Sequence, residues 1–203
     1  MNLFDLLKLL SVAALMGAAF WIGRQIVINE ELRELADDLN SGRSAVQSYL
    51  DRFGYLPGDD PTVSSRWGEV VPNGNGDGRI DGDWLHTGPI DMDEPGAIPE
   101  SKLVWMHLRR ARMWPGFIDG LRSLGLPANA AGGYMGVQSG NFGFEGVVVC
   151  LSGLDADAAG GLDQQLDDGR ADTGYVRGAR REQANAAAPL YSPAATYYLC
   201  RAL

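Results

Sequence analysis

The chain has 203 residues, a length that suits one ordinary domain with an appended segment. Its formal net charge of −9 excludes a general electrostatic attraction for nucleic acid or for anionic lipid headgroups. The 27 glycines indicate a soluble part rich in turns and loops, and they exclude a compact helical bundle.

The first 28 residues form the most apolar part of the sequence. No charged residue lies between Leu9 and Gly23, and the flanking charges are Asp5, Lys8 and Arg24. As a helix, this segment is long enough to cross the hydrocarbon core of a bilayer. A cleaved secretory signal begins with a basic stretch, whereas here an acid comes first. A plain signal anchor gives no reason for Asp5, because an ionised carboxylate in apolar surroundings is unfavourable unless it is paired.

The run Met1-Asn2-Leu3-Phe4-Asp5 and the apolar stretch behind it resemble the mature N-terminus of type IV pilins and of the pseudopilins of type II secretion. In that family a peptidase removes a leader, the new first residue is N-methylated, and the fifth residue is almost always Glu. The resemblance implies that Met1 is the processed residue and that Asp5 fills the acidic position. The chain departs from the family in having Asp for Glu and in lacking a Pro near Ile22.

An acid at position 5 has a physical use in a filament. A free amino terminus in lipid or in a filament core is a costly cation, and Asp5 of a neighbouring subunit can neutralise it. Such a pair would give assembly both a register and a direction. Lys8 is a competing partner, because it follows Asp5 by three residues on the same helix face.

Residues 29–54 are polar but keep a helical period. Apolar or small residues recur alternately three and four positions apart, which predicts one buried stripe: Leu32, Leu35, Leu39, Gly42, Val46, Tyr49 and Phe53. Gly54 is a suitable C-terminal stop. We therefore predict one long helix, with residues 1–28 as its membrane or filament-core half and 29–54 as its amphipathic half. The alternative is a hinge at Asn40-Ser41-Gly42.

Residues 55–203 are predicted to form a globular head. The runs 143–151 and 195–200 have strand composition, 155–168 has helical periodicity, and 100–108 is helix-like. Together with the long helix, these segments predict an α+β fold in which the helix packs on a small antiparallel sheet. The run Pro57-Gly58-Asp59 after the helix is similar to the helix exit of many bacterial pilin-like proteins.

The two cysteines, Cys150 and Cys200, both lie in the last third of the chain. In an extracytoplasmic protein such a pair forms one disulfide, whereas in a cytosolic protein the two would be free buried thiols. The anchor-like segment favours the disulfide, which would fix the final strand to the sheet and close the C-terminal region of the head.

A Gly-rich loop after the helix has the ligand spacing of a calcium site. Its positions match the first nine of an EF-hand loop, with a backbone carbonyl at the seventh. The ligand candidates are Asn73, Asn75, Asp77, Arg79 and Asp81. Position twelve, where the bidentate Glu belongs, is Trp84, so Asp83 or an acid from 91–94 would have to close the site. The alternative is a turn with solvated polar groups.

The sequence carries no phosphate loop, no Gly-x-Ser-x-Gly elbow and no His-Glu-x-x-His motif, and we predict that the protein is not an enzyme. The short basic run Arg109, Arg110 and Arg112 is interpreted as the solvated face of a helix.

The predicted function is that of a structural subunit. The resemblance implies a homopolymer of type IV pilin kind that is processed by a prepilin peptidase and built by the pilus assembly machinery. Before assembly the chain would reside in the inner membrane, and afterwards it would form an extracellular filament for adhesion, motility or DNA uptake. Nothing in the sequence directly indicates nucleic acid binding. The alternatives are a minor pilin or pseudopilin and, from another class, a membrane-tethered calcium-binding or enzymatic domain.

Overall fold

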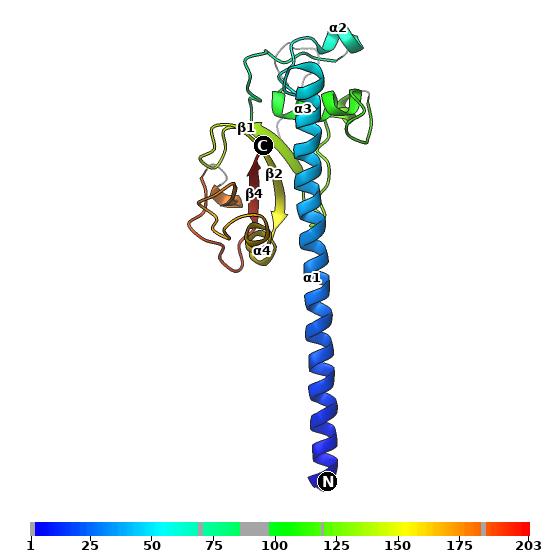
Figure 1. Ribbon diagram of the computed structural model, residues 1–203, viewed down its shortest axis with the longest axis vertical. Helices are drawn as coiled ribbons and strands as arrows, with labels where there is room; N and C mark the ends of the chain where they lie inside the picture. Colours follow the sequence, from blue (N-terminus) through cyan, green and yellow to red (C-terminus); the bar gives the residue numbers. More distant parts are fainter. Residues whose placement is uncertain (1–2, 69–70, 86–97, 119, 184–185) are drawn as a thin grey trace.

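The computed structural model describes residues 3–68, 71–85, 98–118, 120–183 and 186–203. Within helical segments, the side chains of residues 3–9, 11, 24–28 and 121 are outside the description. The fold is α+β, as predicted: a single long helix, α1 (Leu3–Phe53), runs past a small head and projects far beyond it (Figure 1). The N-terminal half of α1 is thus the stem, and its C-terminal half belongs to the head.

Helix α1 is continuous through Asn40-Ser41-Gly42, so the alternative of a hinge at these residues is wrong. It ends where Gly54 adopts a positive φ of 77° and donates its N–H to the Leu50 carbonyl, 2.8 Å away. The predicted stripe is buried against the head, and four of its members are fully inaccessible to solvent: Leu35, Leu39, Val46 and Tyr49.

The head contains a four-stranded antiparallel sheet with the strand order β1-β2-β4-β3. The strands are β1 (Met135–Ser139), β2 (Val147–Leu154), β3 (Val176–Arg180) and β4 (Tyr197–Ala202). The described helices besides α1 are α2 (Val63–Trp67), α3 (Glu100–Arg110) and α4 (Ala156–Leu166), with short 3₁₀ turns at Leu121–Leu124 and Arg181–Gln183.

The sheet has an apolar cluster on each face. On one face, Val149 and Leu151 of β2 pack with Leu39 of α1 and with α4 in the main core. On the other face, Trp84 and Phe142 cover the smaller cluster that contains both cysteines. Alternation along β2 explains this arrangement, because successive side chains of a strand point to opposite faces.

Gly42 allows α1 to approach the sheet closely. A Cβ at this position would lie 2.9 Å from Cγ1 of Val149 and 3.2 Å from Cε of Met135, which is closer than side chains normally pack. The prediction that this position belongs to the buried stripe is confirmed, and the missing side chain explains how close the helix comes.

The predicted disulfide is present. Cys150 on β2 and Cys200 on β4 lie directly opposite each other in the register, and their sulfur atoms are bonded. In a chain-entropy treatment, closing a loop of this size restricts the unfolded chain by about 4 kcal/mol. The bond therefore fixes the last strand to the centre of the sheet.

Candidate functional site

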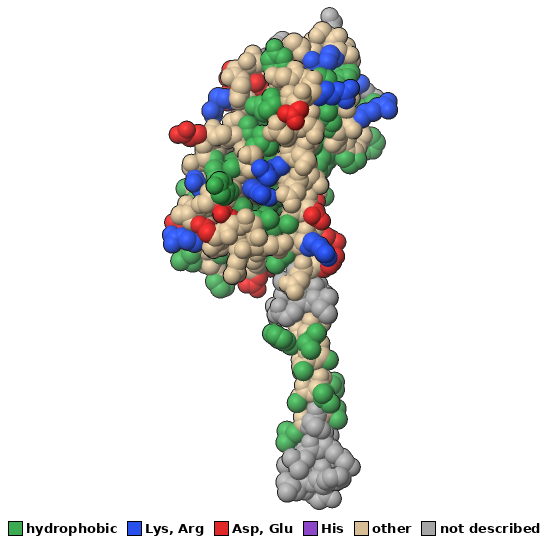
Figure 2. All heavy atoms as spheres, in the orientation of Figure 1, with side chains coloured by type: hydrophobic (Ala, Val, Ile, Leu, Met, Phe, Trp, Pro, Cys, Tyr) green, Lys and Arg blue, Asp and Glu red, His purple; other side chains and the backbone are tan. Residues whose placement is uncertain are grey.

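The stem exposes large apolar side chains. Leu15 is 70% exposed, Phe20 is 77% exposed and Trp21 is 63% exposed, and the space-filling view shows that the stem is narrow and that nothing in the head covers these side chains (Figure 2). Burying one such side chain typically stabilises by about 1.5–3 kcal/mol, so this surface favours a covering partner. In the described part of the chain, no helix combines the length and the apolar character needed to cross a bilayer.

Of the two predicted assembly residues, the structure describes only the backbone of Asp5. Met1 is outside the described residues, and Asp5 lies in α1 with an undescribed side chain. The choice between an intersubunit partner and Lys8 therefore stays a prediction.

In the candidate calcium loop, the side-chain oxygens are bound within the loop and its neighbours. Asn73 Oδ1 accepts from the Ser64 N–H, Asn75 Oδ1 from the Asp77 N–H, and Asp77 Oδ1 from the Arg79 N–H, at 2.8–2.9 Å. The Asp81 carboxylate lies 3.5 Å from Nε of Arg79. Asn75 and Asp77 thus form successive tight turns, and Asn73 joins the loop to α2.

Two buried carboxylates that the spacing did not predict occupy the centre of this loop. Asp59 accepts hydrogen bonds from the backbone N–H groups of residues 76, 77 and 78, and Glu100 accepts from those of Asn75 and Asp81. Carboxylate oxygens of Asp59, Asp77 and Glu100 all lie within 4.8 Å of one another. Burial raises the pKa of Asp59 and of Glu100, and the backbone donors oppose that shift.

Glu100 lies outside the loop sequence that has the predicted ligand spacing. It is the first residue of α3, and its carboxylate binds backbone groups 19 and 25 residues earlier in the chain. Spacing rules consider only one contiguous segment, so they cannot find an acid contributed by the next helix.

A second buried polar cluster ties the end of α1 to the head. The Tyr49 hydroxyl donates to Asp60 Oδ2 over 2.8 Å, and Arg66 forms an ion pair with the same carboxylate. Burial opposes ionisation of Asp60, but hydrogen bonds from Thr62 and Tyr49 and the charge of Arg66 hold its pKa below the usual value.

His107 completes this cluster from α3. Its Nδ1 accepts from the Gly58 N–H over 2.8 Å, and Nε2 lies 2.9 Å from the Pro72 carbonyl, so the ring is the neutral tautomer with its proton on Nε2. The ring is fully buried, and this burial lowers its pKa to about 4. His107 therefore has a structural role, joining two loops to α3.

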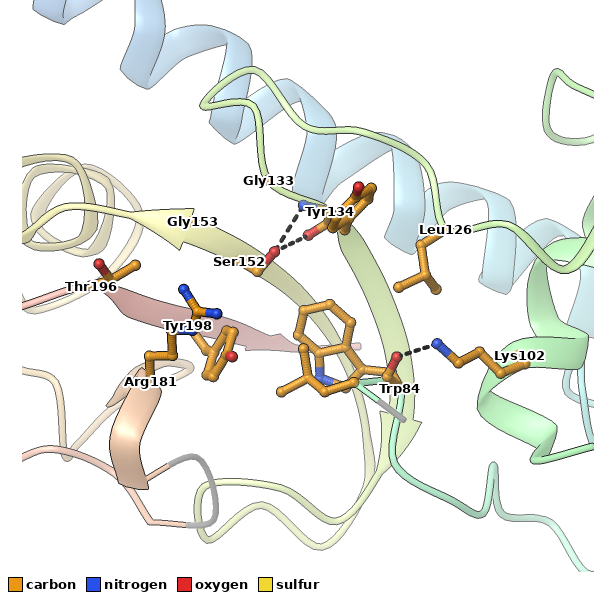
Figure 3. Close-up of a pocket in the computed structure, with 11 residues that line it drawn as sticks. Trp84, Lys102, Leu126, Gly133, Tyr134, Ser152, Gly153, Arg181, Thr196 and Tyr198 are labelled. Atoms are coloured by element: carbon orange, nitrogen blue, oxygen red, sulfur yellow. Dashed lines mark hydrogen bonds between the residues drawn. The ribbon is translucent and has the colours of Figure 1, made fainter. Parts of the chain in front are cut away.

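A pocket of about 390 Å³ opens beside the smaller cluster (Figure 3). Trp84 and Tyr198 form one aromatic wall with ring centroids 5.9 Å apart, and Lys102 donates from Nζ to the Trp84 carbonyl over 2.8 Å. Ser152 accepts from the Tyr134 N–H. The indole Nε1 of Trp84 is buried and has no hydrogen-bond partner in the described part of the chain. The pocket thus has an aromatic wall, while the Lys102 and Tyr134 donors beside it are already paired.

Comparisons of the chain with protein-family models, curated proteins and solved structures found no match.

Proposed function

We propose that this chain is a structural subunit that polymerises through its N-terminal helix into a filament of the type IV pilus kind. The observation that carries the proposal is the continuous helix α1, whose C-terminal half is buried in the head while its stem exposes Leu15, Phe20 and Trp21. A stem of this kind is unfavourable in water as a lone monomer.

Association of several stems removes the exposure of these apolar side chains to water. Parallel stems bury one another's apolar side chains, and the heads then form the outer layer of the assembly. In this arrangement Asp5 of one subunit neutralises the amino group of Met1 in the next, and the inner membrane covers the stem before assembly. The disulfide between Cys150 and Cys200 suits a head that functions outside the cell.

The test combines three variants with electron microscopy of material sheared from cells. Asp5→Ala is expected to abolish filaments while the head stays folded, whereas Asp5→Glu keeps the charge and should retain them. Lys8→Ala should also retain them if the partner of Asp5 is intersubunit. Filaments formed by Asp5→Ala at the wild-type level would refute the role of this carboxylate.

The chemical state of the N-terminus and the location of the chain in the cell distinguish the remaining alternatives. A methylated Met1 in sheared filaments supports the pilin, whereas a processed chain confined to the inner membrane supports a minor pilin or pseudopilin. An unprocessed N-terminus without filaments supports the membrane-tethered domain.

Calcium binding by residues 73–81 stays a separate hypothesis, based on ligand spacing and on the acids that surround the loop. If it holds, calcium at one hundred times its Kd stabilises the head by about 2.7 kcal/mol. Thermal unfolding in excess CaCl₂ and in EGTA measures this, with Asp77→Ala as the variant that should lose the effect. Equal unfolding temperatures in both buffers would remove the hypothesis.

A further inference from the structure

Most of the acids of α1 lie in one short stretch. Where the stem meets the head, the stretch Glu30–Asp38 contains five acids and a single arginine. Glu30, Glu34 and Asp37 are exposed, and Arg33 lies 3.6 Å from the Glu30 carboxylate. Figure 2 shows red side chains with a blue one among them where the stem meets the head, and several blue side chains near the opposite end.

The opposite end of the head carries an arginine-rich pocket of about 610 Å³. Half of its lining residues are arginines and none is acidic; the lining is Arg52, Phe53, Arg66, Trp67, Arg110, Ala111, Arg112 and Met113. Interpreting the basic run as wholly solvated was wrong for Arg109, which is buried and donates to the carbonyls of Pro115 and Ser123. Arg112 is exposed beyond the end of α3.

Aromatic rings hold the guanidinium groups of this pocket in place. Arg66 lies 4.5 Å above the ring of Phe53 and 5.1 Å from that of Trp67, and Arg52 lies 5.1 Å from Phe53. Cation–π contacts of this kind restrict the planar groups. Arg66 is already paired with Asp60, so it adds positive charge to the pocket, while the exposed Arg52 and Arg112 are the groups that can donate to a carboxylate. Because Phe53 already restricts Arg52, less side-chain entropy is lost when Arg52 binds.

The two charged regions are placed at a fixed distance by one rigid element. Five helical turns, about 27 Å, separate Glu34 from Arg52 along α1. Both residues are exposed, so neither is covered by its own head. In an array of parallel stems, a subunit displaced by this distance presents its acidic stretch level with the arginine pocket of the subunit below.

We propose that the arginine pocket binds the Glu30–Asp38 stretch of a second copy of this chain, so that heads associate end to end. This inference rests on the proposed function, because the filament supplies the parallel orientation and the axial offset. The charge complementarity favours a second copy over nucleic acid, since the chain itself provides an acidic helix while its net charge of −9 repels a polyanion.

Site-specific cross-linking in the full chain tests the contact. One tagged copy carries Glu34→Cys and a second, differently tagged copy carries Arg52→Cys. Both native cysteines are in the disulfide, so the introduced thiols are the free ones. Oxidation of membranes or sheared filaments should give a disulfide between the two tags. Either variant alone should give little cross-linked product. The same holds for the control pair of Glu34→Cys with Tyr175→Cys, because Tyr175 is exposed near β3, away from the pocket.

Charge reversal provides the second readout. Glu30→Lys with Glu34→Lys, or Arg52→Glu with Arg112→Glu, should each lower the filament yield about tenfold, because like charges then meet. Combining the acid-to-lysine and arginine-to-glutamate substitutions should restore the filament yield. If each pair of substitutions only impaired folding of its own subunit, combining them would not restore the yield.

The outcomes separate this inference from the proposed function. Filaments without the cross-link above the Tyr175→Cys background, or without rescue, leave the filament in place and overturn the head contact. A cross-link in membranes without any filament supports the contact and refutes polymerisation. If Arg52→Glu instead abolishes binding of a labelled oligonucleotide and leaves assembly intact, the pocket is a polyanion site and the inference is wrong.

Discussion

The two halves of α1 share one backbone but have opposite surroundings. Beside the sheet, Leu39 and Val46 are fully buried, whereas in the stem Leu15 and Phe20 are more than two-thirds exposed. Helix propensity alone does not stabilise such a length, because most helical stability in proteins comes from packing of an apolar face. The head half receives that packing from its own chain, and the stem half lacks it.

The same residue types therefore have different roles in the two halves of α1. Apolar residues in the head half contribute to the stability of the monomer, and those in the stem contribute to association. Substitutions in the two halves should therefore separate folding from assembly.

The largest effect is expected in the stem. Leu15→Asp combined with Phe20→Asp should abolish filament formation, because two carboxylates would have to be buried between packed stems. The unfolding temperature of the head should stay within about 1 °C of the wild type, since neither side chain touches it. Sheared-filament yield and thermal unfolding of the detergent-dispersed subunit measure the two outcomes. Wild-type yield from this variant would mean that the stems do not pack on one another.

The opposite result is expected in the head half. Leu39→Ala should reduce the free energy of unfolding by about 3 kcal/mol, because it leaves a cavity between α1 and the sheet. Urea unfolding of the dispersed subunit measures this loss. Filament yield should fall only in proportion to the unfolded fraction. A complete loss of filaments from a folded Leu39→Ala subunit would contradict the division between the halves.

Periodicity predicted the elements with a strong local pattern. The stripe of α1, the helix at 155–168 and the helix beginning at Glu100 are all present, with ends shifted by a few residues. The strand predicted over 143–151 begins later, at Val147, because Phe142 and Gly143 both have positive φ and form a turn. Ala194, also at positive φ, similarly precedes the predicted last strand.

Strands β1 and β3 were not predicted, since each is five residues long and contains a glycine. Gly136 in β1 has a tertiary reason, because a Cβ there would collide with the indole of Trp84. The polar clusters likewise depend on contacts between residues that are distant in the sequence. Asp59 belongs to the run Pro57-Gly58-Asp59 noted after the helix, but its burial depends on a loop that folds back over it, and no local pattern contains that information.

The buried polar cluster that contains His107 should make the stability of the protein sensitive to acid. In the folded state His107 has a pKa of about 4, against an ordinary value of 6.5, so the folded protein binds its proton less readily than the unfolded chain. The stability due to the neutral ring is present above pH 6.5 and is lost as the pH falls toward 4. The full loss is about 3 kcal/mol.

Comparison with His107→Gln isolates this contribution. Burial raises the pKa of Asp163 to about 6, so Asp163 contributes the opposite sign, with stability gained as the pH falls below 6. Asp163 is common to both proteins and cancels in the difference. The difference in unfolding free energy between wild type and His107→Gln should shrink between pH 6.5 and 4, and a constant difference would show that the ring does not titrate with unfolding.

The smallest changes in stability are expected from alanine substitutions at two glycines of α1. A Cβ at Gly17 would meet nothing within 4 Å, so Gly17→Ala should stabilise the stem helix by about 0.5–1 kcal/mol, the usual gain over glycine. At Gly42 the same methyl group meets Val149, a β-branched side chain with little freedom to turn away. There the overpacking outweighs the helical gain, and Gly42→Ala should lose about 1–2 kcal/mol. Hydrogen exchange around residue 17 and urea unfolding of the head, both on the dispersed subunit, give the two values. Gains of the same sign at both sites would mean that the head does not hold α1 as closely as Gly42 implies.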